Sequence, residues 1–412
     1  MPKSALRTPA PPRGRLALLL GPAFVAAIAY VDPGNVAANV TAGARYGYLL
    51  VWVLLVANAV AVIVQYQSAK LGLVTGSSLP ELLGRRLRRW PRRAFWLQAE
   101  LVAAATDLAE VLGGAIALHL LFGLHLLLGG VIIGLASMAL LVVQTHRGQR
   151  SFEVVIVTLL AVILVGFVSG LLVSPVDGAE FAAGILPRFD GTDSVLLASS
   201  MLGATVMPHV IYLHSALVRD RHGGGLAPGR IRTLIRATRW DVALALVIAG
   251  AINLSMLVLA ASSLRGAAGT DTIEGAHAII ADALGPVIAA AFAIGLLASG
   301  LASTSVGTYA GSVVMGGLLR VRVPLLARRV VTLIPALVIL GLGIDPTLAL
   351  VVSQVALSFG IPFALVPLIS LAGSRRVMGS FVTSVPLRAV SWVATAGIIA
   401  INVVLIVLTF AG

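Results

Sequence analysis

The sequence predicts an all-α protein that crosses a membrane many times. Of the 412 residues, 59% are hydrophobic and only 11% are charged, whereas soluble domains carry about 25% charged residues. The apolar residues gather in runs near the length of about 20 residues that a helix needs to cross a bilayer. These runs are expected to be helical, because backbone groups in hydrocarbon have no water to bond.

The apolar runs predict about eleven spans joined by short loops. Residues 1–15, rich in Pro and Arg, are expected to form a disordered cytoplasmic tail, and residues 16–412 a single transmembrane domain. A cleaved signal peptide is an alternative for the first run, but a second apolar run follows it closely. The predicted spans cover residues 16–42, 47–72, 94–122, 124–144, 152–173, 194–218, 241–263, 286–318, 330–344, 346–371 and 386–410.

The basic residues predict how the chain lies in the membrane. A formal charge of +13 would suggest a nucleic-acid partner for a soluble chain. Here all but Arg45, Arg188 and Arg265 of the 29 Lys and Arg residues fall on the side of the N-terminus when the spans alternate. Because cytoplasmic loops are enriched in Lys and Arg, we expect a multi-pass protein of the cell (plasma) membrane with a cytoplasmic N-terminus, an extracellular C-terminus and no nucleic-acid partner.

Two spans are interrupted near their middle by polar residues and proline. Asp32-Pro33-Gly34-Asn35 breaks the first span, and Gly203-Ala204-Thr205-Val206-Met207-Pro208-His209 breaks the sixth. Proline removes a helical N–H, and glycine loosens the backbone. Matching breaks in two halves of five spans are typical of inverted-repeat transporters, whose site lies at the midplane. The repeats would cover about 16–173 and about 194–371, with an extra helix at about 386–410.

The first break predicts a cation site, because an aspartate in hydrocarbon needs a cation or a proton. Beside Asp32, Asn35 adds a neutral oxygen one turn on, and the breaks free the carbonyl groups of Ala29 and Ala204. Met207 would supply a thioether, which suits Mn²⁺, Fe²⁺, Co²⁺ or Cd²⁺ but not Mg²⁺ or Ca²⁺. The alternatives are two proline-kinked helices with incidental polar residues, and a methionine that only packs.

The tenth span carries the polar pair Ser353-Gln354 in an otherwise apolar helix. Gln354 could join the cation site, or it could hold two helices together by a hydrogen bond. The residues alone leave both interpretations open.

A row of carboxylates in the third span indicates a proton pathway. Glu100, Asp107 and Glu110 are seven and three residues apart, which places them on one helical face. They are expected to face the protein interior, because carboxylates in contact with lipid are too costly. One pair of possible partners, Arg328 and Arg329, is equally explained by the excess of basic residues in cytoplasmic loops. The expected partners of the row are His209 and His214, whose charge switches near neutral pH, together with Arg328 and Arg329.

The sequence lacks the residues and motifs that several other function classes require. The chain has no cysteine, which excludes thiolate metal sites and cysteine nucleophiles. It has no G-x-x-x-x-G-K-[ST] or H-E-x-x-H motif, which disfavours ATP hydrolysis and a membrane metalloprotease, and we expect no enzymatic activity. Two rivals are a cation channel, which would not need a proton relay, and a transporter of another substrate such as an amino acid, whose carboxylate Asp32 would repel.

These motifs resemble the natural resistance-associated macrophage protein (Nramp) family of proton-coupled divalent metal transporters. The resemblance extends from about Leu16 to the end of the chain. Met207 argues against the related branch that carries Mg²⁺, which lacks this methionine. The matching stretches are Asp32-Pro33-Gly34-Asn35, Met207-Pro208-His209, Thr106-Asp107-Leu108-Ala109-Glu110 and Ser353-Gln354.

The resemblance implies a LeuT-type fold, with two inverted repeats of five spans plus one extra helix. It implies import of Mn²⁺ or Fe²⁺ with protons by alternating access, so that the metal is substrate and no cofactor is expected. The bilayer, the metal ion and protons are the expected partners, with no obligatory protein partner. The implied metal ligands are Asp32, Asn35, Met207 and the Ala204 carbonyl, joined in some conformations by the Ala29 carbonyl and Gln354. The implied proton pathway runs through His209, Glu100, Asp107, Glu110, Arg328 and Arg329.

Overall fold

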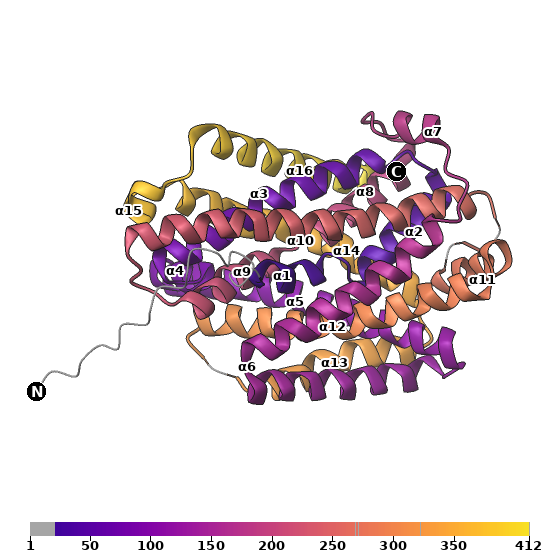
Figure 1. The fold of residues 1–412 in the computed structure, drawn as a ribbon, viewed down its shortest axis with the longest axis horizontal. Helices are drawn as coiled ribbons and strands as arrows, with labels where there is room; N and C mark the ends of the chain where they lie inside the picture. Colours follow the sequence, from indigo (N-terminus) through magenta and orange to yellow (C-terminus); the bar gives the residue numbers. More distant parts are fainter. Residues whose placement is uncertain (1–20, 268, 271, 322, 412) are drawn as a thin grey trace, which may run out of the picture.

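The computed structural model describes residues 21–267, 269–270, 272–321 and 323–411, and every regular element among them is helical. The expected tail, residues 1–15, and the start of the first predicted span lie outside this part of the chain. The long helices lie side by side in one bundle (Figure 1). The elements are α1 (Pro22–Ala29), α2 (Pro33–Tyr46), α3 (Val51–Thr75), α4 (Leu79–Arg86), α5 (Arg89–Phe122), α6 (Leu126–Leu171), α7 (Gly178–Ala183), α8 (Gly191–Thr205), α9 (Pro208–His222), α10 (Pro228–Ser263), α11 (Ile273–Leu284), α12 (Pro286–Leu318), α13 (Leu325–Gly341), α14 (Pro346–Ala372), α15 (Arg375–Met378), η2 (Gly379–Phe381) and α16 (Val385–Ala411).

The helices account for all the predicted spans. Within the described residues, eight helical segments are long and apolar enough to cross a membrane, among them α3, α5, α10, α12 and α14. The three other predicted spans correspond to shorter helices. The first is divided between α1 and α2, the fourth contributes Leu126–Leu140, and the ninth is α13, which has 17 residues. The all-α polytopic fold predicted from composition is therefore confirmed.

The structure differs from the prediction between the fourth and fifth spans. We expect a loop at 145–151, but α6 is one helix of 46 residues. The segment from Leu126 to Leu171 contains no proline, so no residue in it is sterically barred from a helix. The two apolar parts of α6 still pack as separate spans. Gly134 lies against Leu333 of α13, whereas Gly166 lies against the backbone of α12.

Both breaks end at a proline that starts a new helix. Helix α2 begins at Pro33 with Asp32 as its N-cap, and α9 begins at Pro208 after the N-cap Met207. Proline is favoured at this position, because the N–H that it lacks would have no helical partner there. Asp32 and Met207 are both fully buried, so the breaks lie inside the bundle.

Close contacts between helices bring the two breaks together. A Cβ atom on Gly203 of α8 would overlap the backbone carbonyl of Gln354 in α14, and one on Gly34 of α2 would overlap the Gln354 side chain. A Cβ on Gly113 of α5 would overlap Pro33. Small residues let helices approach this closely in membranes. Helices α5 and α14 are therefore packed directly against the first break.

The two ends of the bundle differ in charge. Helices α4 and α15 lie at one end, and α7 and α11 lie at the other (Figure 1). At the second end, Arg265 forms an ion pair of 2.8 Å with Glu180 of α7. We call the first the basic end, because it carries Arg85, Arg86, Arg219, Arg375 and Arg376 in the last turns of α4, α9 and α15.

Candidate functional site

The first break presents a carboxylate and an amide that are tied to the second break. Asp32 Oδ1 accepts hydrogen bonds from the Asn35 backbone N–H at 2.8 Å and from Asn35 Nδ2 at 3.1 Å. The same amide nitrogen donates to the Ala204 carbonyl at 3.1 Å. The first contact is an ordinary helix N-cap. The contact between Asn35 Nδ2 and the Ala204 carbonyl links α2 to α8 across 169 residues of sequence, so the two breaks form one site.

Three oxygen atoms at this site are buried without a hydrogen bond. They are Asp32 Oδ2, Asn35 Oδ1 and Gln354 Oε1, and none of them has a partner within the described part of the chain. Gln354 Nε2 donates to Ser353 Oγ at 3.3 Å, so the amide oxygen is left over. Buried polar atoms without partners are rare and costly. A cation bound among them would satisfy all three oxygens.

The backbone at the first break leaves one carbonyl group available. The Tyr30 carbonyl accepts from Asn253 Nδ2 at 2.6 Å, and the Val31 carbonyl accepts from Ser299 Oγ at 2.6 Å. The Ala29 carbonyl would need the N–H four residues on, which is Pro33 and has none. The Ala204 carbonyl is in the same position, because Pro208 stands four residues after it. Equivalent prolines thus leave both carbonyls without a helical partner, and the Ala204 carbonyl accepts from Asn35 Nδ2 instead.

Met207 lies at the second break, fully buried between α8 and α9. With Met207, the predicted donor set is mixed: one carboxylate, two amides, backbone carbonyls and a thioether. Among the described residues, no group of three or more His, Cys, Asp or Glu side chains is arranged to hold a metal ion, so a search for acid-rich or thiolate metal sites would miss this one. A set with one carboxylate and one soft ligand suits a divalent transition metal better than Mg²⁺ or Ca²⁺.

The carboxylate row of α5 meets two arginines of α13. Arg328 donates to Glu100 Oε1 through Nη2 at 2.8 Å and through Nε at 3.1 Å. Asp107 lies between the pair, 3.6 Å from Arg328 Nη1 and 3.5 Å from Arg329 Nη1. Both arginines are buried. The enrichment of basic residues in cytoplasmic loops does not require arginines in the interior. The burial of this pair therefore favours a role with the carboxylates.

Glu110 forms no ion pair with the arginines in the described residues, and it is the member of the row nearest to Gly113, which packs on the first break. Both of its carboxylate oxygens are buried without a hydrogen bond. Gly113, one turn further along α5, packs on Pro33. Glu100 retains 20% side-chain exposure, whereas the Asp107 side chain has none. The row therefore extends from the partly exposed Glu100 into the buried interior beside the first break.

The two histidines fall into different networks. His209 Nδ1 is 3.3 Å from Thr106 Oγ1, next to Asp107 in sequence, so it joins the α5 row. His214 Nδ1 is 2.8 Å from Gln65 Oε1, and Gln65 donates to the Tyr30 hydroxyl. The structure therefore does not place His214 with the α5 carboxylates. Its network reaches the first break instead, through Tyr30.

Several polar residues of the site were missed by the sequence reasoning. Gln65 and Tyr30 form the second network, and Asn253 joins Asn39 Nδ2 through its Oδ1 at 2.8 Å. Ser137 of α6 accepts from Arg329 Nε at 2.9 Å. An amide side chain inside an apolar span, the feature that pointed to Gln354, also occurs at Gln65 and Asn253 and could have indicated these residues.

Comparison with known proteins identifies the family. Residues 23–408 match the sequence profile of Nramp, natural resistance-associated macrophage protein-like. The chain belongs to the Nramp family. It is 57% identical over 394 residues to a divalent metal cation transporter, MntH, of Mycobacterium tuberculosis, covering 96% of this chain and 92% of the relative. It is 46% identical over 393 residues to MntH of Bacillus subtilis, covering 95% and 92%.

Solved structures of this family and of others share the fold. A crystal structure of the Eremococcus coleocola manganese transporter matches with a TM-score of 0.86 at 29% identity, covering 96% of this chain and 88% of that chain. MhsT in complex with L-phenylalanine matches with a TM-score of 0.62 at 16% identity, covering 92% and 98%. The second likeness bears on the fold alone. The Nramp chain therefore has the LeuT-type fold predicted for it.

Proposed function

We propose that this Nramp chain is a secondary active transporter that imports divalent transition-metal ions, Mn²⁺ foremost and also Fe²⁺, Co²⁺ and Cd²⁺, coupled to protons by alternating access. The MntH relatives are named as divalent metal cation transporters, and the Eremococcus protein is a manganese transporter. The metal is the substrate, and the proposal requires no cofactor and no enzymatic step.

One observation carries the proposal: the buried oxygens of Asp32, Asn35 and Gln354 have no hydrogen-bond partner where two helix breaks meet. Three such atoms at one place are costly to the folded chain unless a ligand satisfies them. A dication would also balance the buried Asp32 carboxylate. Met207 and the carbonyls of Ala29 and Ala204 complete the proposed ligand set.

Another substrate of the same fold is less compatible with these residues. A helix break that binds an amino acid holds the substrate carboxylate at a helix N-terminus. In this chain the N-terminus of α2 is capped by the carboxylate of Asp32, whose Oδ2 is left unpaired. Two carboxylates at one buried place would repel each other. The site therefore favours a cation over an amino acid.

We assign the proton pathway to the α5 row and its neighbours. The pathway is proposed to lead from Glu110 past Asp107 to Glu100, with Arg328 and Arg329 holding the two outer carboxylates. A continuous line of ionisable groups inside a membrane is the usual form of a proton relay. His209 contacts this line through Thr106, and His214 is proposed as a second proton site beside the first break.

We further propose that the chain lies in the cell membrane with its N-terminus in the cytoplasm and its C-terminus outside. The gathering of arginines at the basic end supports this orientation, because cytoplasmic loops are enriched in Lys and Arg. The bilayer, the metal ion and protons are the only partners that the proposal needs.

The test is metal uptake into proteoliposomes that contain a pH-sensitive dye. We expect saturable Mn²⁺ uptake together with acidification of the lumen. Uptake that rises linearly with Mn²⁺ concentration and leaves the luminal pH unchanged would favour a cation channel instead. No uptake of any divalent metal, with the chain monodisperse and correctly inserted, would contradict the proposal altogether.

A further inference from the structure

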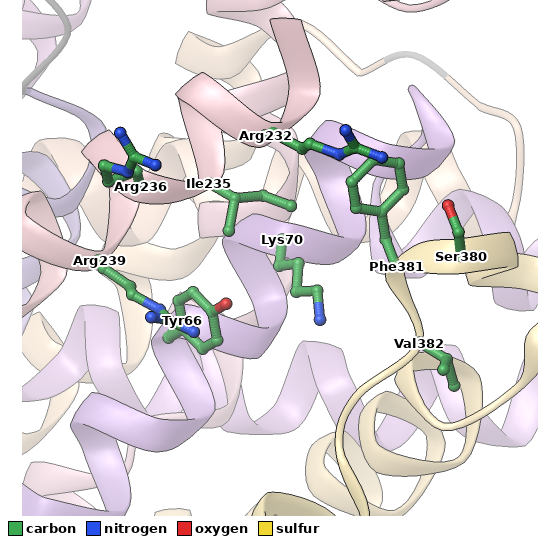
Figure 2. Close-up of a pocket in the computed structure, with 9 residues that line it drawn as sticks. All are labelled: Tyr66, Lys70, Arg232, Ile235, Arg236, Arg239, Ser380, Phe381 and Val382. Carbon is green, nitrogen blue, oxygen red and sulfur yellow. The ribbon is translucent and has the colours of Figure 1, made fainter. Parts of the chain in front are cut away.

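A basic cavity lies at the basic end, away from the proposed metal site. Its volume is about 400 Å³, and this open cavity is lined by residues of α3, the first turns of α10 and the η2 segment with Val382 after it. Four cationic side chains line it, together with Tyr66 and Phe381 (Figure 2). The cations are Lys70 of α3 and Arg232, Arg236 and Arg239 of α10.

The cations of this cavity have no carboxylate to balance them. No ion pair in the described part of the chain involves any of the four, and residues 1–20 contain no Asp or Glu. Their contact is with an aromatic ring instead. The Arg239 guanidinium lies 5.5 Å and the Lys70 ammonium 5.9 Å from the centre of the Tyr66 ring. A ring face attracts a cation but does not neutralise it.

Lys70 makes the absence of an anion costly. The residue is only 8% exposed, and Figure 2 shows its side chain between the Tyr66–Arg239 pair and Phe381. A charge that is buried without a partner is expensive. Ordinary enrichment of basic residues in cytoplasmic loops explains exposed groups such as Arg85 and Arg89. Arg232, Arg236 and Arg239 are exposed as well, but this enrichment does not explain why they line one cavity with the largely buried Lys70 of α3.

The cavity lies where the lipid-facing surface begins. On α10, the residues that follow the arginines are exposed and apolar: Trp240 is 58% exposed, Leu244 45% and Val247 61%. On α16, which follows η2, Val385 is 68% exposed. Tryptophan is typical of the membrane–water interface. The cavity is therefore at the depth of the phospholipid headgroups, with apolar helix surface next to it for acyl chains.

We propose that this cavity binds the phosphate group of an anionic phospholipid. Lys70 and the three arginines would hold the phosphate oxygens, because guanidinium and ammonium groups are the usual phosphate ligands in proteins. The acyl chains would lie along the exposed apolar residues of α10 and α16. This site is independent of metal transport, since none of its residues belongs to the proposed metal or proton sites.

The experiment measures binding of fluorescently labelled phosphatidylglycerol to the full chain in neutral detergent. Arg232→Gln, Arg236→Gln and Arg239→Gln are combined in one variant, and Arg85→Gln, Arg86→Gln and Arg89→Gln form a control that removes the same charge outside the cavity. Each cation near a membrane surface changes affinity for an anionic lipid by about fivefold, so the cavity variant should bind on the order of a hundredfold more weakly. The control should change binding by less than about fivefold.

Two further comparisons separate this proposal from its alternatives. Lys70→Gln should weaken binding and Lys70→Arg should restore it, while Mn²⁺ binding in all the variants reports that the chain is folded. Equal losses in the cavity variant and the control would mean general surface attraction and would overturn the site. Displacement of the lipid by millimolar inorganic phosphate but not by unlabelled phosphatidylglycerol would mean a soluble-anion site and would overturn the lipid assignment.

Discussion

At the scale of single residues, Asp32 has two roles that can be separated. It caps α2 through Oδ1, and it leaves Oδ2 unpaired in the site. Loss of an N-cap costs about 1 kcal/mol of stability, whereas loss of the only carboxylate at the two breaks removes the charge that balances a dication. Removing an N-cap from a helix elsewhere in the chain costs similar stability but leaves the site intact, which provides a control.

We therefore expect Asp32→Ala to abolish Mn²⁺ binding while the chain remains folded. Isothermal titration calorimetry measures the binding. Asp345→Ala is the matched control, because Asp345 is also an N-cap, with Oδ1 accepting from the Thr347 N–H at 2.8 Å. It should lose similar stability and keep its affinity for Mn²⁺. Near-normal affinity in Asp32→Ala would remove the site assignment.

Met207 is expected to set selectivity. Oxygen ligands suit hard and borderline cations alike, so discrimination against Ca²⁺ and Mg²⁺ must come from a ligand that these ions use poorly. In Met207→Ala, Cd²⁺ uptake should fall most and Mn²⁺ uptake less, and excess Ca²⁺ should begin to compete. A tenfold change in relative affinity, about 1.4 kcal/mol, is a reasonable size for one weak ligand.

Competition uptake of Mn²⁺ and Cd²⁺ against Ca²⁺ measures this effect. Met201→Ala provides the control, because Met201 of α8 is equally buried but precedes the break. It should destabilise the chain through the cavity it leaves and keep the order of metal preference. If Met207→Ala behaves in the same way, Met207 is a packing residue.

At the scale of elements, α5 combines two functions on one face. Glu100 and Asp107 form ion pairs with the arginines of α13, whereas no ion pair of Glu110 is found among the described residues. Gly307 of α12 faces the same place, since a Cβ there would lie 2.9 Å from Glu110 Oε1 and 3.2 Å from Asp107 Oδ1. Helix α12 therefore leaves room around these carboxylates.

We expect Asp107→Asn and Glu110→Gln to reduce metal-driven proton entry more than they reduce metal binding. The reason is that both carboxylates lie in the row and neither belongs to the proposed ligand set. Luminal acidification in proteoliposomes is compared with calorimetric Mn²⁺ affinity for each variant. Unchanged acidification in both would disprove the relay. A loss of Mn²⁺ affinity as large as that of Asp32→Ala would make them ligands instead.

Helix α4 is joined to α9 by an ion pair that should be sensitive to acid. Arg219 Nη1 lies 2.6 Å from Glu81 Oε1. Burial alone would raise the pKa of Glu81, but the Ser78 N–H and the Arg219 guanidinium outweigh it and hold that pKa below its ordinary value. A depressed pKa contributes stability above the ordinary value, and this contribution is lost as the pH falls through the depressed one.

Accordingly, Glu81→Gln should be less stable than the unmodified chain at neutral pH. The difference should be at most about 1 kcal/mol, because the pair is partly exposed. It should begin to decrease as the pH falls below the ordinary carboxylate pKa of about 4.3, and it should disappear below the depressed pKa of Glu81. Thermal unfolding of both proteins across this range is the measurement. A difference that stays constant with pH would mean that packing, not charge, explains the effect.

At the scale of the whole molecule, the orientation can be tested directly because the chain has no cysteine. Ser384 lies between η2 and α16, a few residues after α15 at the basic end, and Ala179 belongs to α7, which lies at the other end (Figure 1); both residues are exposed. In intact cells, a membrane-impermeant maleimide should label Ala179→Cys and spare Ser384→Cys. In broken cells it should label both. The reverse pattern in intact cells would invert the proposed topology.

The fold was largely predictable because apolar length and charge alternation are properties of local sequence. The short helices were not predicted, although Ser78 and Glu81 form the capping box that marks the start of α4. The loop expected inside α6 was wrong, because basic residues do not by themselves end a helix. Prolines were the more reliable marker, since they start α2 and α9.

The site was predictable in part, for a similar reason. Asp32 and Asn35 are three residues apart, so their contact follows from local helix geometry. Gln354 could not be assigned from sequence, because its place depends on the close approach of α14 to Gly34. The network of Gln65 and His214 also joins distant helices. Contacts between helices need the packed structure.

The pairing of α5 with α13 has a consequence for charge balance across the transport cycle. Glu100, Asp107 and Glu110 are accompanied by Arg328 and Arg329, and Asp32 stands nearby in the first break. In this group, four carboxylates and two guanidinium groups leave a formal deficit of two positive charges. One dication fills this deficit, and so do two protons. If the interior stays electrically neutral, metal ions and protons are interchangeable occupants, and each metal ion that enters displaces at most two protons.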